Sequence, residues 1–141
     1  MEKLPEFIVN HPVLVTLFIA ITLMLFWNLF GSAVSGIKQL SPAEATRMIN
    51  HENAVLLDVR STNDYKNGHI LNSRNIPEAE LSSRQEELEK FKKQAIIICC
   101  EHGNISEKAA KILTASGFEM VYSLKGGLGS WRQANLPVTR D

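Results

Sequence analysis

The chain has no excess of charge of either sign and almost no cysteine. Its 15 Lys and Arg residues balance 15 Asp and Glu residues, so the formal net charge is zero. Without a basic surplus, nothing favours the phosphate backbone of nucleic acid as a partner, and we expect none. Only two cysteines occur, Cys99 and Cys100, and because they are adjacent they do not form a disulfide framework. Unpaired thiols are typical of a reducing compartment.

Charge is also missing from a long stretch near the amino terminus. No Asp, Glu, Lys or Arg occurs between Phe7 and Ile37, and the centre of this stretch is strongly apolar. About 20 apolar residues are enough to cross a bilayer as a helix. We therefore expect a short leader over residues 1–12, a transmembrane helix over 13–31, a linker over 32–37 and a soluble domain over 38–141.

A cleaved signal peptide is the alternative interpretation of the apolar stretch. Ala33-Val34-Ser35 has the small residues of a cleavage site. However, Glu2 and Glu6 precede the apolar run against a single Lys3, whereas a signal peptide begins with net positive charge, and the run is too long for a signal peptide. We favour a retained anchor, for which the lipid bilayer is the first partner.

The charges that flank the span indicate its orientation. One Lys precedes it, whereas Lys38 and Arg47 follow it closely. The positive-inside rule then places the carboxyl-terminal domain in the cytoplasm, attached by a single pass to the inner (cell) membrane. Another membrane protein is a further candidate partner in this location.

Beyond the linker, short apolar runs rich in β-branched residues alternate with helical patterns. The expected strands cover residues 37–40, 54–59, 73–76, 95–100 and 120–124. The expected helices cover residues 42–50, 64–68, 79–92 and 106–116, with a last one opening at Gly126. Such alternation predicts an α/β domain with a mostly parallel sheet flanked by helices.

Cys100 ends the most apolar of these strands and is followed by a tight loop and a helix. Backbone N–H groups in such a loop and the positive end of the helix favour thiolate over thiol. Neighbouring strand residues face opposite sides of a sheet, so we expect Cys99 to pack and Cys100 to face the loop. The alternative is that both cysteines only fill the core, as buried cysteines usually do.

Short motifs along residues 38–138 follow one another in a characteristic order. The amino-terminal set is Asp58-Val59-Arg60, Asp64-Tyr65, Gly68-His69-Ile70 and Asn75-Ile76-Pro77. The carboxyl-terminal set is Gly117-Phe118, Val121-Tyr122, Gly126-Gly127 and Trp131, and Cys100-x-x-Gly103-x-x-Ser106 lies between them. Together they resemble a rhodanese domain. An apolar anchor followed by one such domain resembles the membrane-tethered single-domain rhodanese-like proteins of bacteria.

This resemblance implies that Cys100 is the catalytic nucleophile. In rhodaneses the loop cysteine accepts sulfane sulfur from a donor such as thiosulfate, becomes a persulfide and passes the sulfur to an acceptor. Donor and acceptor are small molecules or protein persulfides, and the resemblance implies neither a cofactor nor a metal. By the same resemblance, Asp58 and Arg60 support the loop. The loop and anion cradle comprise Glu101, His102, Gly103, Asn104, Ile105 and Ser106.

Two loop residues depart from the family pattern, which has Arg after the cysteine and Arg or Thr before the serine. This chain has Glu101 and Ile105 at those positions. A carboxylate beside the thiol repels anionic donors, and the loss of a guanidinium removes an anion clamp. Two hypotheses follow: a tethered sulfurtransferase with little thiosulfate activity, or a rhodanese fold of low activity that serves as an interaction module at the membrane.

Two other chemistries fit the same residues poorly. Cys99, Cys100 and His102 lie within four residues, with the thiols on opposite strand faces, and so do not form a tetrahedral metal site. A phosphatase of related fold needs an Arg that closes the loop over a phosphate, and this loop has none.

Overall fold

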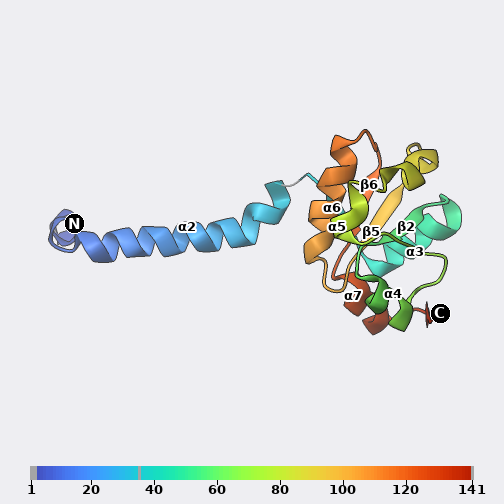
Figure 1. Cartoon of the computed structure of the whole chain (residues 1–141). Helices are drawn as coiled ribbons and strands as arrows, with labels where there is room; N and C mark the ends of the chain where they lie inside the picture. Colours follow the sequence, from blue (N-terminus) through green and yellow to red (C-terminus); the bar gives the residue numbers. More distant parts are fainter. Residues whose placement is uncertain (1–2, 35, 141) are drawn as a thin grey trace. The chain divides into compact units, whose positions relative to one another are not determined.

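The structure is a computed structural model that describes the backbone of residues 3–34 and 36–140 and the side chains of residues 3–29 and 36–140. The chain divides into two compact units, Met1–Gly36 and Ile37–Asp141 (Figure 1). Each unit is described by itself below.

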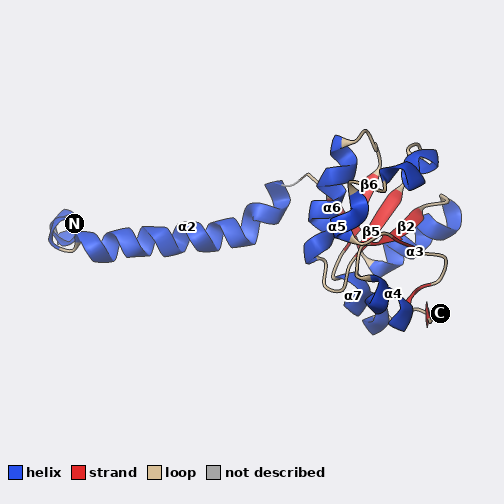
Figure 2. Cartoon of the chain, in the orientation of Figure 1, coloured by secondary structure: helices blue, strands red, loops and turns tan. Residues whose placement is uncertain are grey.

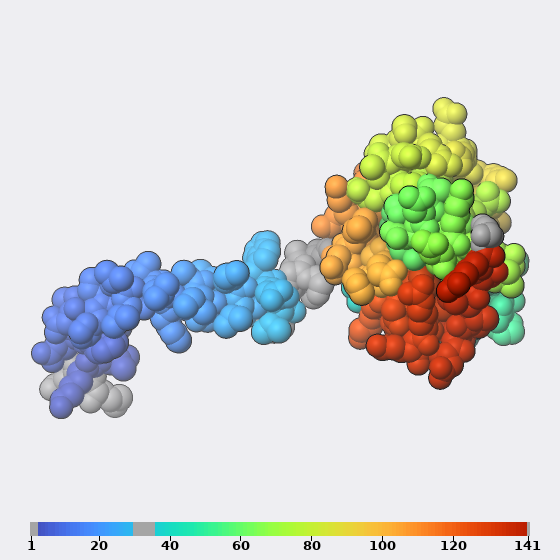
Figure 3. Space-filling model, turned by 60° about the horizontal axis from the view of Figure 1, so that its bottom comes forward, coloured from blue at the N-terminus to red at the C-terminus, as the bar shows by residue number. Residues whose placement is uncertain are grey.

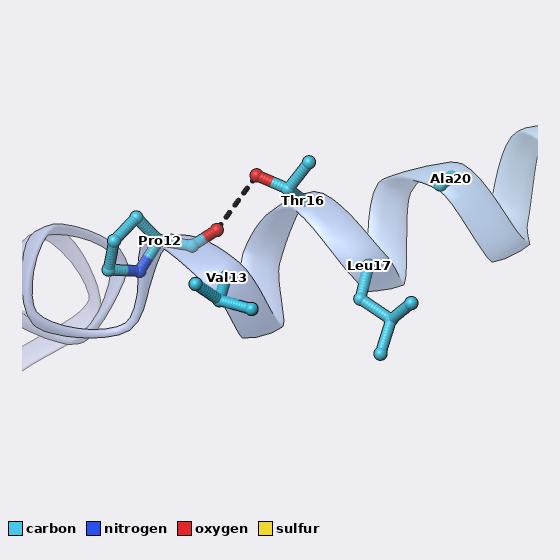
Figure 4. Close-up of a pocket in the computed structure, with 5 residues that line it drawn as sticks. All are labelled: Pro12, Val13, Thr16, Leu17 and Ala20. Atoms are coloured by element: carbon cyan, nitrogen blue, oxygen red, sulfur yellow. Dashed lines mark hydrogen bonds between the residues drawn. The ribbon is translucent and has the colours of Figure 1, made fainter.

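The first unit consists of two helices, α1 (Lys3–Asn10) and α2 (Pro12–Val34). The window Pro12–Leu29 of α2 has a mean hydropathy of 2.1, and none of it is buried. By length and composition, α2 can cross a membrane. Its Thr16 hydroxyl donates to the Pro12 carbonyl at 2.8 Å, which satisfies a polar group on an apolar helix (Figure 4). Helix α1, which lies within the expected leader, was not predicted.

The second unit is built on a parallel sheet. Among the described residues, five strands lie in the order β1-β6-β5-β2-β4, and each neighbouring pair is parallel (Figure 2). Their bounds are Lys38–Leu40 for β1, Val121–Leu124 for β6, Ile96–Cys99 for β5, Val55–Asp58 for β2 and Arg74–Asn75 for β4. The prediction of a mostly parallel α/β sheet is confirmed. A short antiparallel pair, β3 (His69–Ile70) with β7 (Val138–Thr139), was not predicted.

Helices cover both faces of this sheet. One face packs against α5 (Glu78–Leu81), the 3-10 helix η1 (Gln85–Phe91) and α6 (Asn104–Ala115). The other packs against α3 (Pro42–His51) and α7 (Gly127–Gln133), whereas α4 (Thr62–Asn67) follows β2. Strand β5 lies at the centre of the sheet: Ile96 and Ile98 pack on the α6 side and Ile97 on the α7 side, all fully buried.

Local sequence signals account for some elements and not for others. The Ser41 hydroxyl accepts from the Glu44 N–H at 3.2 Å, and the Glu44 carboxylate accepts from the Ser41 N–H at 2.8 Å, which is the expected capping box of α3. The helical stretch expected over residues 79–92 is divided into two pieces, because α5 ends at Leu81 and the 3-10 helix η1 begins only at Gln85. The Ser83 hydroxyl there donates to the Glu80 carbonyl at 2.9 Å, a side-chain bond that competes with helix continuation.

Candidate functional site

Cys100 lies directly after β5, at the carboxyl edge of the sheet. Its side chain belongs to the hydrophobic cluster on the α6 side, and the residue is 1 % exposed. The Gly103 N–H donates to Cys100 Sγ at 2.9 Å. Gly103 has a φ of +94°, in the left-handed region that glycine adopts without strain, and this turn directs its N–H toward the sulfur. The loop thus supplies one backbone donor to the Cys100 sulfur.

The amino terminus of α6 lies at the same sulfur. The helix begins at Asn104, two residues earlier than predicted, so Asn104, Ile105 and Ser106 form its first turn. The partial positive charge of a helix amino terminus favours a negative charge on Cys100 Sγ. Ile105 is 46 % exposed and His102 is also exposed, so neither side chain is packed within the loop.

Ser106 connects the loop to the sheet below it. Its buried hydroxyl lies 3.6 Å from Cys100 Sγ and donates to the Gly103 carbonyl at 2.9 Å. The same oxygen is 2.8 Å from Ser123 Oγ on β6. Sequence reasoning did not single out Ser123, because its contact to Ser106 depends on the pairing of β5 with β6.

Cys99 faces the other side of the sheet, in the cluster with Leu128 and Trp131, and is 1 % exposed. The prediction that the two thiols face opposite sides is therefore confirmed. Burial raises the pKa of the Cys99 thiol, and the nearby Asp58 carboxylate raises it further. Cys99 is a neutral core residue whose thiol donates to the Cys100 carbonyl at 3.5 Å, whereas the Gly103 N–H donates to the sulfur of Cys100.

Arg60 joins three parts of the site from a buried position. Its Nη2 donates to Asp58 Oδ2 and to the Gly68 carbonyl, both at 2.7 Å, and its Nε lies 3.0 Å from Asp58 Oδ1. Its Nη1 reaches Glu101 Oε2 at 3.2 Å. Asp58 and Arg60, predicted as supports, thus lie together at the end of β2 and contact the loop through Glu101.

Glu101 has a second cationic partner that the sequence did not indicate. Nη1 of Arg132, on α7, lies 3.2 Å from Glu101 Oε1. Helices α4 and α7 lie side by side (Figure 3). Arg132 therefore also lies close to Gly68, which ends α4: a Cβ added at Gly68 would be 3.4 Å from Arg132 Nη2. The sequence predicts that the Glu101 carboxylate repels anionic donors, but in the structure Arg60 and Arg132 both contact this carboxylate and offset its charge.

Helix α7 also holds the backbone of the loop. The N–H groups of Leu128 and Gly129 donate to the carbonyls of Cys100 and Glu101, at 2.8 and 3.1 Å. A Cβ at Gly127 would lie 2.3 Å from the Cys100 carbonyl oxygen, so only glycine allows this close approach. The Gly126-Gly127 motif therefore serves the geometry of the Cys100 loop directly.

Metal ligands are not grouped in this region or elsewhere in residues 3–34 and 36–140. Over that part of the chain, no three His, Cys, Asp or Glu side chains lie close enough together to hold a metal ion.

Comparison with known proteins agrees with the fold and the motifs. The model of the family "Rhodanese-like domain" matches residues 41–134, and the chain belongs to this family. It is 38 % identical over 97 residues to the thiosulfate sulfurtransferase GlpE of Pseudoalteromonas translucida, covering 69 % of this chain and 90 % of that one. The predicted resemblance is confirmed.

Two further similarities cover different parts of the chain. The uncharacterized protein YibN of Escherichia coli strain K12 is 36 % identical over 141 residues, 99 % of each chain, so this similarity extends over the amino-terminal unit. Among solved structures, the rhodanese-related protein of Thermoplasma volcanium superposes with a TM-score of 0.67 at 30 % identity, covering 74 % of this chain and 99 % of that one.

Proposed function

We propose that this protein is a membrane-tethered sulfurtransferase that carries sulfane sulfur as a persulfide on Cys100. The observation that carries the proposal is the 2.9 Å hydrogen bond from the Gly103 N–H to Cys100 Sγ, at the amino terminus of α6. A donor and a helix terminus aimed at one sulfur stabilise a thiolate, which is the nucleophilic form of cysteine. The similarity to the thiosulfate sulfurtransferase GlpE supports the same chemistry.

The reaction takes place in two displacements. In the first, the Cys100 thiolate attacks the sulfane sulfur of the donor, the donor's S–S bond breaks, and its electron pair leaves with the remainder of the donor. With thiosulfate that remainder is sulfite. In the second, a nucleophile such as cyanide or a thiolate takes the outer sulfur of the persulfide, and the Cys100 thiolate is regenerated. The Gly103 N–H and the α6 terminus stabilise the negative charge that is present on the Cys100 sulfur before and after each turnover.

The charges beside Cys100 favour a donor that is not a small dianion. Asp58, Arg60, Glu101 and Arg132 form one connected group of two carboxylates and two guanidiniums, so its net charge is zero. Thiosulfate therefore finds no free cation there. A persulfide on a small thiol or on a protein transfers the same sulfur without needing an anion clamp, and we expect this class of donor to react faster.

Helix α2 tethers this chemistry to a membrane, with the second unit in the cytoplasm. Support comes from the hydropathy of Pro12–Leu29 and from Lys38 and Arg47 beyond it. A reporter that is active only outside the cytoplasm, fused after Asp141, should stay silent. A strong signal would reverse the orientation, and full-length protein in the soluble fraction would remove the anchor.

Mass spectrometry of the full chain tests the sulfur chemistry. After incubation with a low-molecular-weight persulfide, we expect the mass of one sulfur atom to be added to Cys100. Cys99→Ser should retain the added sulfur and Cys100→Ser should lose it. Sulfur on Cys99 would contradict the assignment of the nucleophile.

A second candidate function is an interaction module of low intrinsic activity. It is favoured by the burial of Cys100, 1 % exposed, under a loop that Glu101 holds against two arginines. If neither a persulfide nor thiosulfate loads Cys100 in the folded protein, this function becomes the better account of the site.

A further inference from the structure

Helix α1 separates its side chains into two faces. At 3.6 residues per turn, positions three, four and seven apart lie on the same side of a helix. The polar members at such spacing are Lys3, Glu6 and Asn10. The apolar members at such spacing are Leu4, Phe7 and Ile8. Helix α1 is therefore amphipathic.

The apolar face of α1 is not covered by the protein. In α1, all of whose residues the structure describes, none is buried. Leu4 is 73 % exposed, Phe7 53 % and Ile8 47 %. Apolar area left in water costs about 25 cal/mol per Å² relative to burial, so a contiguous face of this kind indicates a binding surface.

The chain changes direction between α1 and α2 (Figure 1). Pro12 starts α2 and has no N–H to continue the hydrogen bonding of α1. The two helices enclose an open cavity of about 450 Å³. Its lining consists of Leu4, Phe7, Ile8, Leu14, Val15 and Phe18. The apolar face of α1 is thus continuous with the apolar surface of α2.

We propose that α1 is an interfacial helix, which lies in the boundary between headgroups and acyl chains of the bilayer that α2 crosses. Its Leu4, Phe7 and Ile8 contact the acyl chains, and its polar stripe faces water. The proposal depends on the membrane anchor of the proposed function. The occupant of the corner is lipid hydrocarbon, because every lining residue is apolar and continues the surface of α2.

The length of α2 fits this arrangement. The 18 residues of Pro12–Leu29 rise about 27 Å at 1.5 Å per residue, close to the hydrocarbon thickness of about 30 Å. The span thus begins where α1 ends. A helix lying flat at that point fixes the depth of Pro12 at the membrane surface. Because α1 carries one Lys and one Glu, its binding should not depend on anionic lipid.

Single labelling sites in the full chain test the proposal. An environment-sensitive fluorophore is attached to Leu4→Cys, Glu6→Cys, Ile8→Cys or Asn10→Cys, in a Cys99→Ser, Cys100→Ser background reconstituted into phosphatidylcholine vesicles. We expect labels at positions 4 and 8 to be quenched by a shallow spin-labelled lipid. We also expect them to be several-fold less quenched by aqueous iodide than labels at positions 6 and 10. Adding anionic lipid should leave the pattern unchanged.

Each other outcome overturns the proposal in a recognisable way. Equal iodide quenching at all four positions means that α1 is in water, and equal lipid quenching means that it continues the span. Protection of positions 4 and 8 from both quenchers means that protein, such as a second copy of the chain, covers the apolar face. A fifth label at Leu17→Cys separates failure of the interfacial helix from failure of the membrane anchor. If this label is quenched by lipid, the anchor stands even where the proposal for α1 fails. If it is quenched by aqueous iodide, the anchor itself is wrong.

Discussion

Replacing Glu101 by Gln should increase the use of anionic sulfur donors. The Glu101 carboxylate accepts from Arg60 and Arg132 at 3.2 Å each, and its side chain is 42 % exposed. Gln keeps the shape and removes the charge. The connected group with Asp58 then changes from net zero to one positive charge, contributed by the guanidiniums that contact residue 101, next to Cys100.

The size of the gain follows from Coulomb's law. For a donor anion about 7 Å from the changed charge, the interaction is roughly 0.6 kcal/mol at a dielectric of about 80 and roughly 2.4 kcal/mol at about 20. Because Glu101 and Arg132 are both nearly half exposed, the value should lie near the lower limit. About 1 kcal/mol corresponds to a roughly fivefold rise in kcat/KM for thiosulfate.

Thiosulfate:cyanide sulfurtransfer by the full chain measures the effect, at low ionic strength and again near 1 M salt. The gain should shrink at high salt, where the Debye length is only about 3 Å. Glu101→Asp keeps the charge and is the matched control, and Cys100→Ala gives the blank. A gain of the same size at both salt concentrations, or in Glu101→Asp, would refute the electrostatic explanation.

Three further predictions concern the scaffold and can be read from unfolding in urea, followed by Trp131 fluorescence in a Trp27→Phe background. Gly127→Ala places a Cβ 2.3 Å from the Cys100 carbonyl and should lower the free energy of unfolding by about 3 kcal/mol or more. Gly117 has a φ of +93° but open space around it, so Gly117→Ala should lower it by only about 1 kcal/mol. Equal losses would contradict the close-approach argument. Arg60→Met leaves the buried Asp58 carboxylate without its cation and should lower the free energy of unfolding by about 3–5 kcal/mol. The double variant with Asp58→Asn removes the unpaired charge and should recover part of this stability. If nothing is recovered, the unpaired charge is not the cause of the loss. Burial raises the pKa of the Cys99 thiol, so at alkaline pH the folded protein keeps a proton that the unfolded chain releases. The stability that Cys99 contributes is therefore fully present below about pH 8.5 and falls above that pH. The difference in stability between wild type and Cys99→Ala should shrink by roughly 2 kcal/mol from pH 7 to pH 10, and a constant difference would contradict this explanation.

Elements with local causes could be predicted from the sequence. A run of β-branched residues with no charge specifies β5, and Ser41 and Glu44 specify the start of α3 through their own hydrogen bonds. The placement of Cys99 and Cys100 on opposite faces follows from the period of a strand. In each case the residues that make the contact are close in the sequence.

Features that depend on distant packing could not be predicted. Strands β3 and β7 have two residues each, and their partners lie far apart in the sequence: His69 pairs with Thr139, 70 positions later, and Ile70 pairs with Val138, 68 positions later. Two residues are too few to show the alternating pattern of a strand, and nothing local in the sequence indicates a partner so far away. Arg132 looks like an ordinary helix-surface cation, and only the packing of α7 beneath the loop brings it to Glu101. Arg132, which offsets the charge of Glu101 in the loop, was therefore not predicted as part of the site.

The pairing of Glu101 changes how its departure from the family pattern should be understood. A lone carboxylate directly after Cys100 would repel any negative charge that develops on the Cys100 sulfur. Here Arg60 and Arg132 neutralise it, and both also contact or approach the Gly68 turn. Under the proposed function, the loop therefore retains the Gly103 N–H at the Cys100 sulfur and gives up attraction for small anions. That combination suits a donor recognised by its own surface, such as a persulfide carried by another protein.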